Sequence, residues 1–123
     1  MQLCSAVWAV AHLWSVHTGA VPNNNTFGIG IECERSAYNV QLGAFRNSLG
    51  RESNYAAIGH DWGVHWQAGL FAGVASGYNY RPVNPIAGAR FGYAADRWKV
   101  QTLLMPPGTN TPACVHLMVE VRL

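Results

Sequence analysis

Two short segments of the chain carry side chains that could transfer an acyl group. His17 supplies an imidazole, and Asn47 and Ser48 supply an amide next to a hydroxyl. A hydroxyl beside an imidazole is the minimum set for nucleophilic or general-base chemistry on an ester. Asn-Ser before Leu49 and Gly50 is also a good turn sequence, so a purely structural interpretation of this segment stays open.

Cations near these segments could bind the phosphates of a lipid. Arg46, Arg51 and Arg81 lie in loops, and guanidinium groups bind phosphate through paired hydrogen bonds. Asn25, at the entry to the second apolar segment, is assigned to the same ligand-binding set. The other histidines show no metal-ligand spacing, so we expect no metal and no cofactor.

Eight apolar segments must position these residues. The gaps between the segments alternate between long (residues 19–25, 46–53, 76–84 and 106–112) and short (residues 34–36, 61–65 and 95–97). An even number of strands with long loops at one end and tight turns at the other is typical of small outer-membrane barrels. The sequence therefore predicts an all-β fold, an eight-stranded antiparallel up-and-down β-barrel that forms a single domain over residues 1–123. His17, Asn47 and Ser48 would then lie at one rim.

The strand assignments depend on alternation of apolar and polar residues with a period of two. The alternation is regular in residues 27–33, 38–44, 66–74, 98–102 and 115–123. It is less clean in residues 7–17, where Trp8, Val10, His12 and Trp14 share one predicted face. A short helix is the alternative for that segment.

Alternation alone does not say which face points inward, because a soluble barrel buries its apolar face and a membrane barrel turns it to lipid. The polar faces are rich in glycine and neutral amides, which favours lipid outside. Strand charges could pair across a narrow lumen: Glu32, Arg90, Lys99, Glu120 and Arg122. Aromatic residues near strand ends resemble an interfacial belt: Tyr38, Tyr55, Trp62, Trp66, Tyr78, Tyr80, Tyr93 and Trp98. Strands barely long enough to span, and a chain that ends on Leu123 instead of an aromatic residue, count against the membrane.

Composition excludes several classes of protein. Charged residues are 11% of the chain, against roughly a quarter in ordinary soluble domains, and hydrophobic residues are 50%. The net charge of +2 and scattered arginines give no reason to expect nucleic-acid binding. The first basic residue is Arg35, so no secretory signal is visible, and either a signal was removed or the protein is made without one. Cys4, Cys33 and Cys114 are interpreted mainly as small strand residues, with a Cys33–Cys114 bridge left open.

Prolines give a second clue about the long-loop end. Pro82 and Pro85 lie at the start of the sixth strand, and Pro106 and Pro107 end the seventh. Proline cannot donate to a ladder, so these positions predict a gap in the wall that could admit an acyl chain sideways. Prolines that merely bound strands are the alternative.

Several segments resemble the small eight-stranded lipid A palmitoyltransferases (PagP-like outer-membrane barrels), at low overall identity. The resemblance is carried by Trp-Ser-Val-His at residues 14–17, by residues 23–30, by Ala-Phe-Arg-Asn-Ser at residues 44–48, and by residues 57–62 and 68–74. It implies that His17 and Ser48 are catalytic. The catalytic Asp of that family is Asn47 here, and an amide can orient a partner but carries no negative charge. Small barrels encoded by phages and prophages share some of these patterns.

Two functions follow as hypotheses. The first is an outer-membrane barrel that binds lipid or acyl chains and acts as an acyltransferase or esterase, with His17 as base, Ser48 as nucleophile and Asn47 as orienting group. The second is a soluble cytoplasmic barrel, phage-encoded, that has an apolar interior and binds a host protein or small ligand through its long-loop rim.

Overall fold

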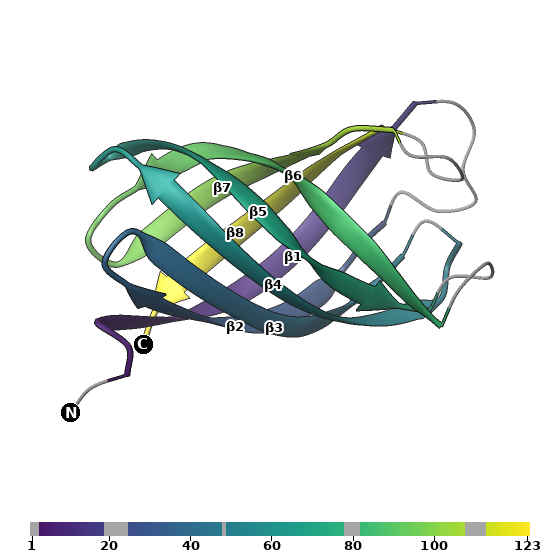
Figure 1. Ribbon diagram of the computed structural model, residues 1–123, viewed down its shortest axis with the longest axis horizontal. Coiled ribbons are helices and arrows are strands. Elements are labelled where there is room, and N and C mark those ends of the chain that lie inside the picture. The colour runs from purple at the N-terminus through teal and green to yellow at the C-terminus, as the bar shows by residue number, and fades with distance from the viewer. Residues whose placement is uncertain (1–2, 19–24, 48, 78–81, 108–112) are drawn as a thin grey trace.

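The computed structural model describes residues 3–18, 25–47, 49–77, 82–107 and 113–123. It contains eight strands: β1 (Ala6–His17), β2 (Gly28–Arg35), β3 (Tyr38–Arg46), β4 (Glu52–Trp62), β5 (Trp66–Ser76), β6 (Val83–Ala94), β7 (Trp98–Met105) and β8 (Cys114–Arg122). Each strand pairs antiparallel with the next, and β1 pairs with β8 to close the barrel (Figure 1). The predicted fold is confirmed, and the helix alternative for the first segment is wrong.

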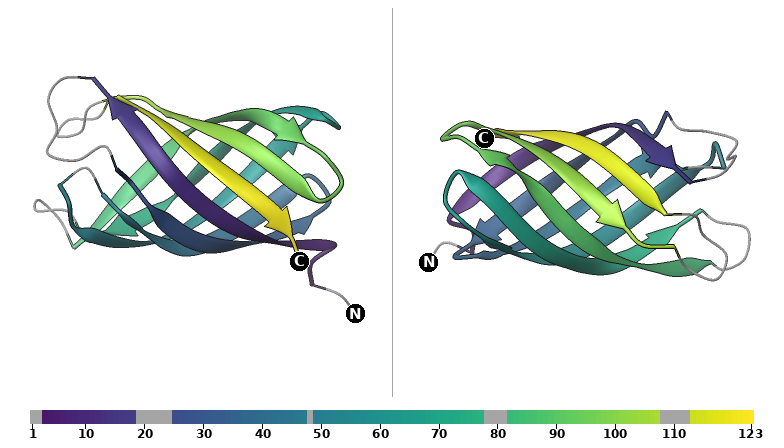
Figure 2. Two further views of the ribbon diagram at one scale, coloured as in Figure 1. Left: turned by 180° about the vertical axis from the view of Figure 1, so that it is seen from behind. Right: turned by 90° about the horizontal axis from the view of Figure 1, so that it is seen from above.

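The two ends of the barrel differ as the gap lengths predicted. The C-terminus and the short turns lie at one end, and the described strand ends that flank the longer connections lie at the other (Figures 1 and 2). Ser36 in the β2–β3 turn has a φ of 56°, and Gly63 and Gly77 have φ of 105° and 90°. These positive values are what tight reversals of the chain require. Among the described residues, no helix is long and apolar enough to cross a membrane.

The lumen is polar and the outer face is apolar. Glu32, Lys99 and Glu120 are at most 1% exposed, whereas Ile29 and Leu70 are 75% and 59% exposed. The soluble alternative required an apolar interior, and the burial pattern is the reverse. The alternation predicted for β2, β3, β5 and β7 is confirmed, except that Cys33, Ala44 and Thr102, predicted on the outer face, are half-buried. In β8 the same pattern holds until Arg122, which was expected in the lumen and is exposed.

Strand β1 departs from simple alternation because it contains a bulge. Its register with β8 shifts between His12 and Trp14. Trp8, Val10 and His12 share one face as predicted, and that face points into the lumen, but Trp14 is 47% exposed and Ser15 is buried in its place. An extra residue in one strand reverses the face of everything that follows it. The prediction that Trp14 shares the face of His12 is therefore wrong.

Among the described residues, the exposed members of the predicted aromatic belt lie at the short-turn end, and Tyr78 and Tyr80 lie outside the described residues. Tyr38, Trp62, Trp66 and Trp98 are exposed at the short-turn end, and Tyr93 packs against Trp66 and Trp98. Tyr55 was assigned to the belt but is buried in the lumen. Its hydroxyl lies 2.6 Å from where a Cβ on Gly30 would be, and its ring lies 2.8 Å from the equivalent point on Gly43. These two glycines therefore leave room for the phenol, and the Gly-Ile-Gly pattern at residues 28–30 belongs to a strand.

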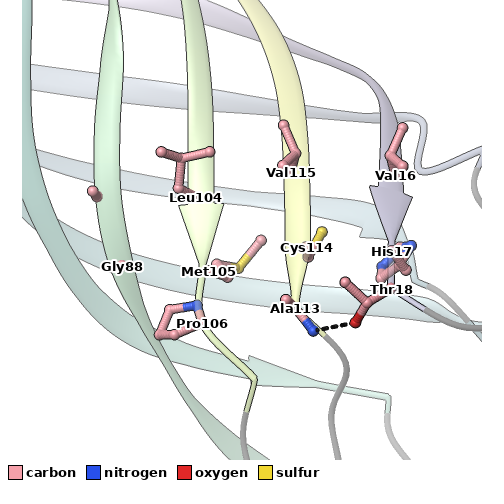
Figure 3. A pocket seen from close by; sticks show the side chains of 11 residues that line it. Val16, His17, Thr18, Gly88, Leu104, Met105, Pro106, Ala113, Cys114 and Val115 are labelled. Atoms are coloured by element: carbon pink, nitrogen blue, oxygen red, sulfur yellow. Dashed lines mark hydrogen bonds between the residues drawn. The ribbon is translucent and has the colours of Figure 1, made fainter.

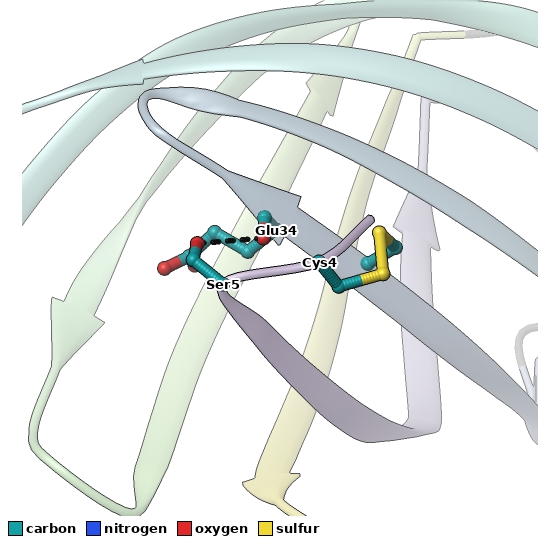
Figure 4. Close-up of a disulfide and its surroundings, with 4 residues drawn as sticks. Cys4, Ser5 and Glu34 are labelled. Carbon is teal, nitrogen blue, oxygen red and sulfur yellow. Dashed lines mark hydrogen bonds between the residues drawn. A yellow bond between two sulfur atoms is a disulfide. The ribbon is translucent and has the colours of Figure 1, made fainter. Parts of the chain in front are cut away.

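A disulfide joins the N-terminal segment to β2. Cys4 is bonded to Cys33, and the backbone N–H and the hydroxyl of the neighbouring Ser5 both donate to the Glu34 carbonyl (Figure 4). This pairing corrects the interpretation of all three cysteines as packing residues, and it replaces the Cys33–Cys114 bridge that had been left open. Cys114 is free.

Candidate functional site

The middle and short-turn end of the lumen are filled by an ion-pair cluster. Arg90 on β6 contacts Glu32 at 3.2 Å, Asp61 at 3.4 Å and Glu120 at 3.9 Å. Lys99 on β7 contacts Glu32 at 2.9 Å and Glu34 at 2.8 Å, and its ammonium lies over the Trp8 ring. The predicted pairing of strand charges across the lumen is confirmed for four of the five residues, Arg122 being the exception.

A second polar network continues from this cluster toward the long-loop end. Gln41 donates to Glu32 and accepts from the Tyr55 hydroxyl. Tyr55 also contacts His12, which contacts His116 at 2.8 Å. The sequence predicts no role for these histidines, because their partners come from strands that lie far apart along the chain. Within the described residues, no group of three or more His, Cys, Asp or Glu side chains could hold a metal ion.

The wall of the barrel changes between β6 and β7. Among the described residues, the ladder between these strands ends at the Ala89–Leu104 pair, although β6 continues to Val83. Residues 83–88 thus pair with β5 alone. Pro106 and Pro107 follow β7 directly. This geometry agrees with the gap predicted from the prolines. The ladder between β1 and β2 is also incomplete and ends at His12–Gly28.

An apolar groove of about 570 Å³ lies beside the shortened ladder (Figure 3). Val16, Leu104 and Val115, which are exposed on the outer face, contribute to its lining. Met105 and Cys114 also line it, from positions that alternate toward the lumen. The groove is therefore lined from both faces of the wall. It lies where β6 continues past the end of its ladder with β7.

His17 is the predicted site residue that lies at this groove. It is the last residue of β1, is half-buried, and lines the groove next to Thr18 (Figure 3). The Thr18 hydroxyl accepts from the Ala113 N–H, which ties the ends of β1 and β8 together. A side chain at this position can reach a molecule that enters through the wall.

Asn47 organises the β3–β4 connection. Its amide nitrogen donates to the Ser53 hydroxyl at 3.0 Å and to the Gly77 carbonyl at 2.9 Å. Its amide oxygen accepts from the backbone N–H groups of Leu49 and Arg51. The side chain is completely buried. Asn47 therefore forms the turn, which was the structural alternative for this segment. Its contacts with Leu49 and Arg51 fix the backbone that follows position 48.

The remaining predicted residues lie at the same rim or outside the described part of the chain. Arg46 and Arg51 are exposed, and Arg46 donates to the Gly50 carbonyl. Asn25 is exposed just before β2. Ser48 and Arg81 lie outside the described residues, so the structure does not test whether His17 and Ser48 meet.

Comparison with known proteins agrees on the fold. A de novo designed transmembrane β-barrel superposes with a TM-score of 0.71 at 17% identity, over 99% of this chain and 98% of the design. The N-terminal β-barrel domain of OprF from Pseudomonas aeruginosa superposes with a TM-score of 0.63 at 13% identity, over 99% of this chain and all of that domain. No protein-family model and no curated protein sequence matches the chain. At these identities, the likeness shows the fold alone, a closed β-barrel.

Proposed function

We propose that this chain is a small outer-membrane barrel that binds an acyl chain of a membrane lipid in the groove beside β6 and β7. One observation carries the proposal: the β6–β7 ladder ends at Ala89–Leu104, and an apolar groove lies at that place on an otherwise apolar outer wall. Residues 83–88 pair with β5 alone, so the hydrogen-bonded wall is open beside the groove. An acyl chain would enter the groove from the side through this opening.

The size and lining of the groove support a hydrocarbon ligand. Its volume of about 570 Å³ lies within the range of roughly 300–1,000 Å³ for small-molecule sites. Leu104, Met105 and Pro106 offer hydrocarbon and a thioether, and His17 places one polar group at the long-loop end. An ester head group at the membrane surface would lie near that imidazole, with Arg46 and Arg51 at the same rim.

The filled lumen argues against a pore. Arg90 and Lys99 bind carboxylates contributed by several strands, and these side chains occupy the barrel interior. Eight strands leave an interior just wide enough for side chains. A function at the wall and rim is therefore favoured over transport through the centre.

Lipid capture can be tested with a phospholipid whose acyl chain carries a photoreactive diazirine. The protein is reconstituted in vesicles containing this lipid, irradiated, and mapped by peptide mass spectrometry. We expect cross-links to concentrate on residues 86–89, 104–106 and 113–115. Leu104→Trp should fill the groove and lower the yield there about tenfold, which corresponds to roughly 1.4 kcal/mol of binding free energy.

Leu70→Trp is the matched control, because Leu70 has the same outward orientation on β5 and lies outside the groove lining. It should leave the cross-link pattern unchanged. Cross-links spread evenly around the barrel, with no response to Leu104→Trp, would contradict a bound acyl chain.

Acyl transfer extends this proposal along the line of the palmitoyltransferase resemblance. His17 would act as base and Ser48 as nucleophile, with Asn47 holding the loop. His17→Ala and Ser48→Ala should each abolish transfer from a phospholipid donor to lipid A in vesicles, and Ser5→Ala at the opposite end should not. Unchanged lipid profiles in both variants would remove this activity. Phage origin stays a prediction.

A further inference from the structure

We propose that Ser15 and His116 form a second hydroxyl–imidazole dyad, which accepts an acyl group from a lipid ester. This inference rests on the proposed function, since it needs an acyl ester in the groove beside β6 and β7. It assigns the chemistry to residues of β1 and β8 that sequence analysis left without a catalytic role.

The dyad has the geometry of a nucleophile and its base. Ser15 Oγ lies 2.6 Å from His116 Nδ1 and 2.7 Å from Thr26 Oγ1. Ser15 and His116 are opposite each other in the β1–β8 ladder and are 2% and 5% exposed. The bulge before Trp14 is what turns Ser15 into the lumen. Without it, regular alternation would place Ser15 on the outer face, away from the imidazole.

The dyad lies directly behind the groove. Val16 and His17, the next residues of β1, line the groove, as do the neighbours of His116 in β8, Cys114 and Val115. Ser15 precedes Val16 and His116 follows Val115, so both members of the dyad lie one residue from the groove lining.

A chain of hydrogen bonds fixes which atom of each ring carries a proton. The Glu32 carboxylate only accepts, so Gln41 turns its NH₂ toward Glu32 and its oxygen toward Tyr55. The Tyr55 hydroxyl donates to Gln41, and therefore accepts from His12 Nε2. With both rings neutral, His12 Nδ1 then accepts from His116 Nε2.

The consequence is that His116 Nδ1 presents a lone pair to Ser15. Every donor in the chain points from Ser15 toward Glu32, which is the alignment in which successive hydrogen bonds strengthen one another. In a serine nucleophile with a histidine base, a third group orients the imidazole in this manner. His12 is the positioning residue here, and Tyr55 and Gln41 hold it in place.

The reaction step is an acyl transfer. Ser15 Oγ bonds to the ester carbonyl carbon while its proton moves to His116 Nδ1. The ester C–O bond then breaks, and the alcohol leaves with that proton. Water or a second hydroxyl attacks the acyl-serine by the same route and restores Ser15. No oxidant, reductant or metal enters the balance.

The test uses an alkyl fluorophosphonate, which reacts with activated serines and releases fluoride. The folded barrel in vesicles is incubated with the probe, digested with trypsin and mapped by mass spectrometry. The first basic residue is Arg35, so Ser15 lies in the peptide of residues 1–35, whereas Ser48 lies in the peptide of residues 47–51. Fragment ions separate Ser15 from Ser5. We expect the label on Ser15.

Variants then assign the roles. Ser15→Ala should lose the label, and His116→Gln should slow labelling by about 100-fold or more, the contribution typical of a general base. Ser76→Ala on β5 should label at the wild-type rate. Heat-modifiable gel migration checks that each variant folds. The position of the label in the wild-type protein tests the proposal even if a variant fails to fold.

Two outcomes would overturn the inference: a label on Ser48 alone, or no label on the folded wild-type protein. The diazirine lipid is run in parallel. Cross-links in the groove without a label on Ser15 would remove the dyad and leave lipid binding intact. Absence of both would remove the proposed function as well.

Discussion

Arg90 shows what a single side chain must do in a polar lumen. Its guanidinium contacts three carboxylates, from β2, β4 and β8, and also donates to Asn39 and Gln101. Charges taken out of water are tolerated only when they are paired and hydrogen-bonded. One residue therefore links strands on opposite sides of the barrel.

Removal of Arg90 should be among the most damaging single changes in the protein. Arg90→Met leaves the fully buried carboxylates of Glu32 and Glu120 with one cation fewer, which should lower the free energy of unfolding by about 3–5 kcal/mol. Urea unfolding in vesicles, followed by tryptophan fluorescence, measures the loss.

Arg122→Met is the matched control for that change. Arg122 is exposed and has no ion pair among the described residues, so the substitution should cost less than about 0.5 kcal/mol. Equal losses in the two variants would show that the lumen cluster contributes nothing specific.

At the scale of the strands, sequence periodicity could predict most faces and could not predict their exceptions. The period of two in β3 and β5 assigned every side chain to the correct face, because strand geometry alone sets that alternation. The bulge in β1 escaped prediction because it is defined by pairing with β8. The disulfide partner of Cys33 could not be predicted either. Cys4 lies before the first strand, and only the pairing of β1 with β2 brings it close to Cys33.

The disulfide should stabilise the barrel by closing the chain between Cys4 and Cys33, which are 29 residues apart. A loop of this length corresponds to about 3–4 kcal/mol in the chain-entropy account. Dithiothreitol should therefore lower the urea midpoint of the wild-type protein. It should leave the midpoint of the Cys4→Ala/Cys33→Ala double variant unchanged, and that midpoint should equal the wild-type value in reductant.

Cys114→Ala controls for general thiol effects, because Cys114 is free. Its response to dithiothreitol should match that of the wild-type protein. A wild-type midpoint that does not respond to the reductant would contradict a stabilising bridge.

At the scale of the whole molecule, the alternation is compatible with two barrels, one with the apolar face inside and one with the polar face inside. The burial of the charged side chains distinguishes between them. A soluble and a membrane barrel share the same period, so the choice depends on which face fits inside eight strands. The charged face carries both signs, and its side chains pair across the lumen, as Lys99 does with Glu32. The candidate site could be predicted only in part. His17 was predicted at the long-loop rim and lines the groove there. The contact between Ser15 and His116 depends on the bulge in β1, which the sequence does not reveal.

We infer that the apolar outer face of the barrel lies in lipid. Single cysteines placed in turn at positions 68–75 of β5, in a Cys114→Ser background, can carry a nitroxide whose collisions with oxygen and with a water-soluble nickel complex are measured in vesicles. Positions 68, 70, 72 and 74 should show high oxygen and low nickel collision rates, and the positions between them should show low rates of oxygen collision. The opposite phase, or high nickel collision rates at Leu70 and Ala72, would contradict the account.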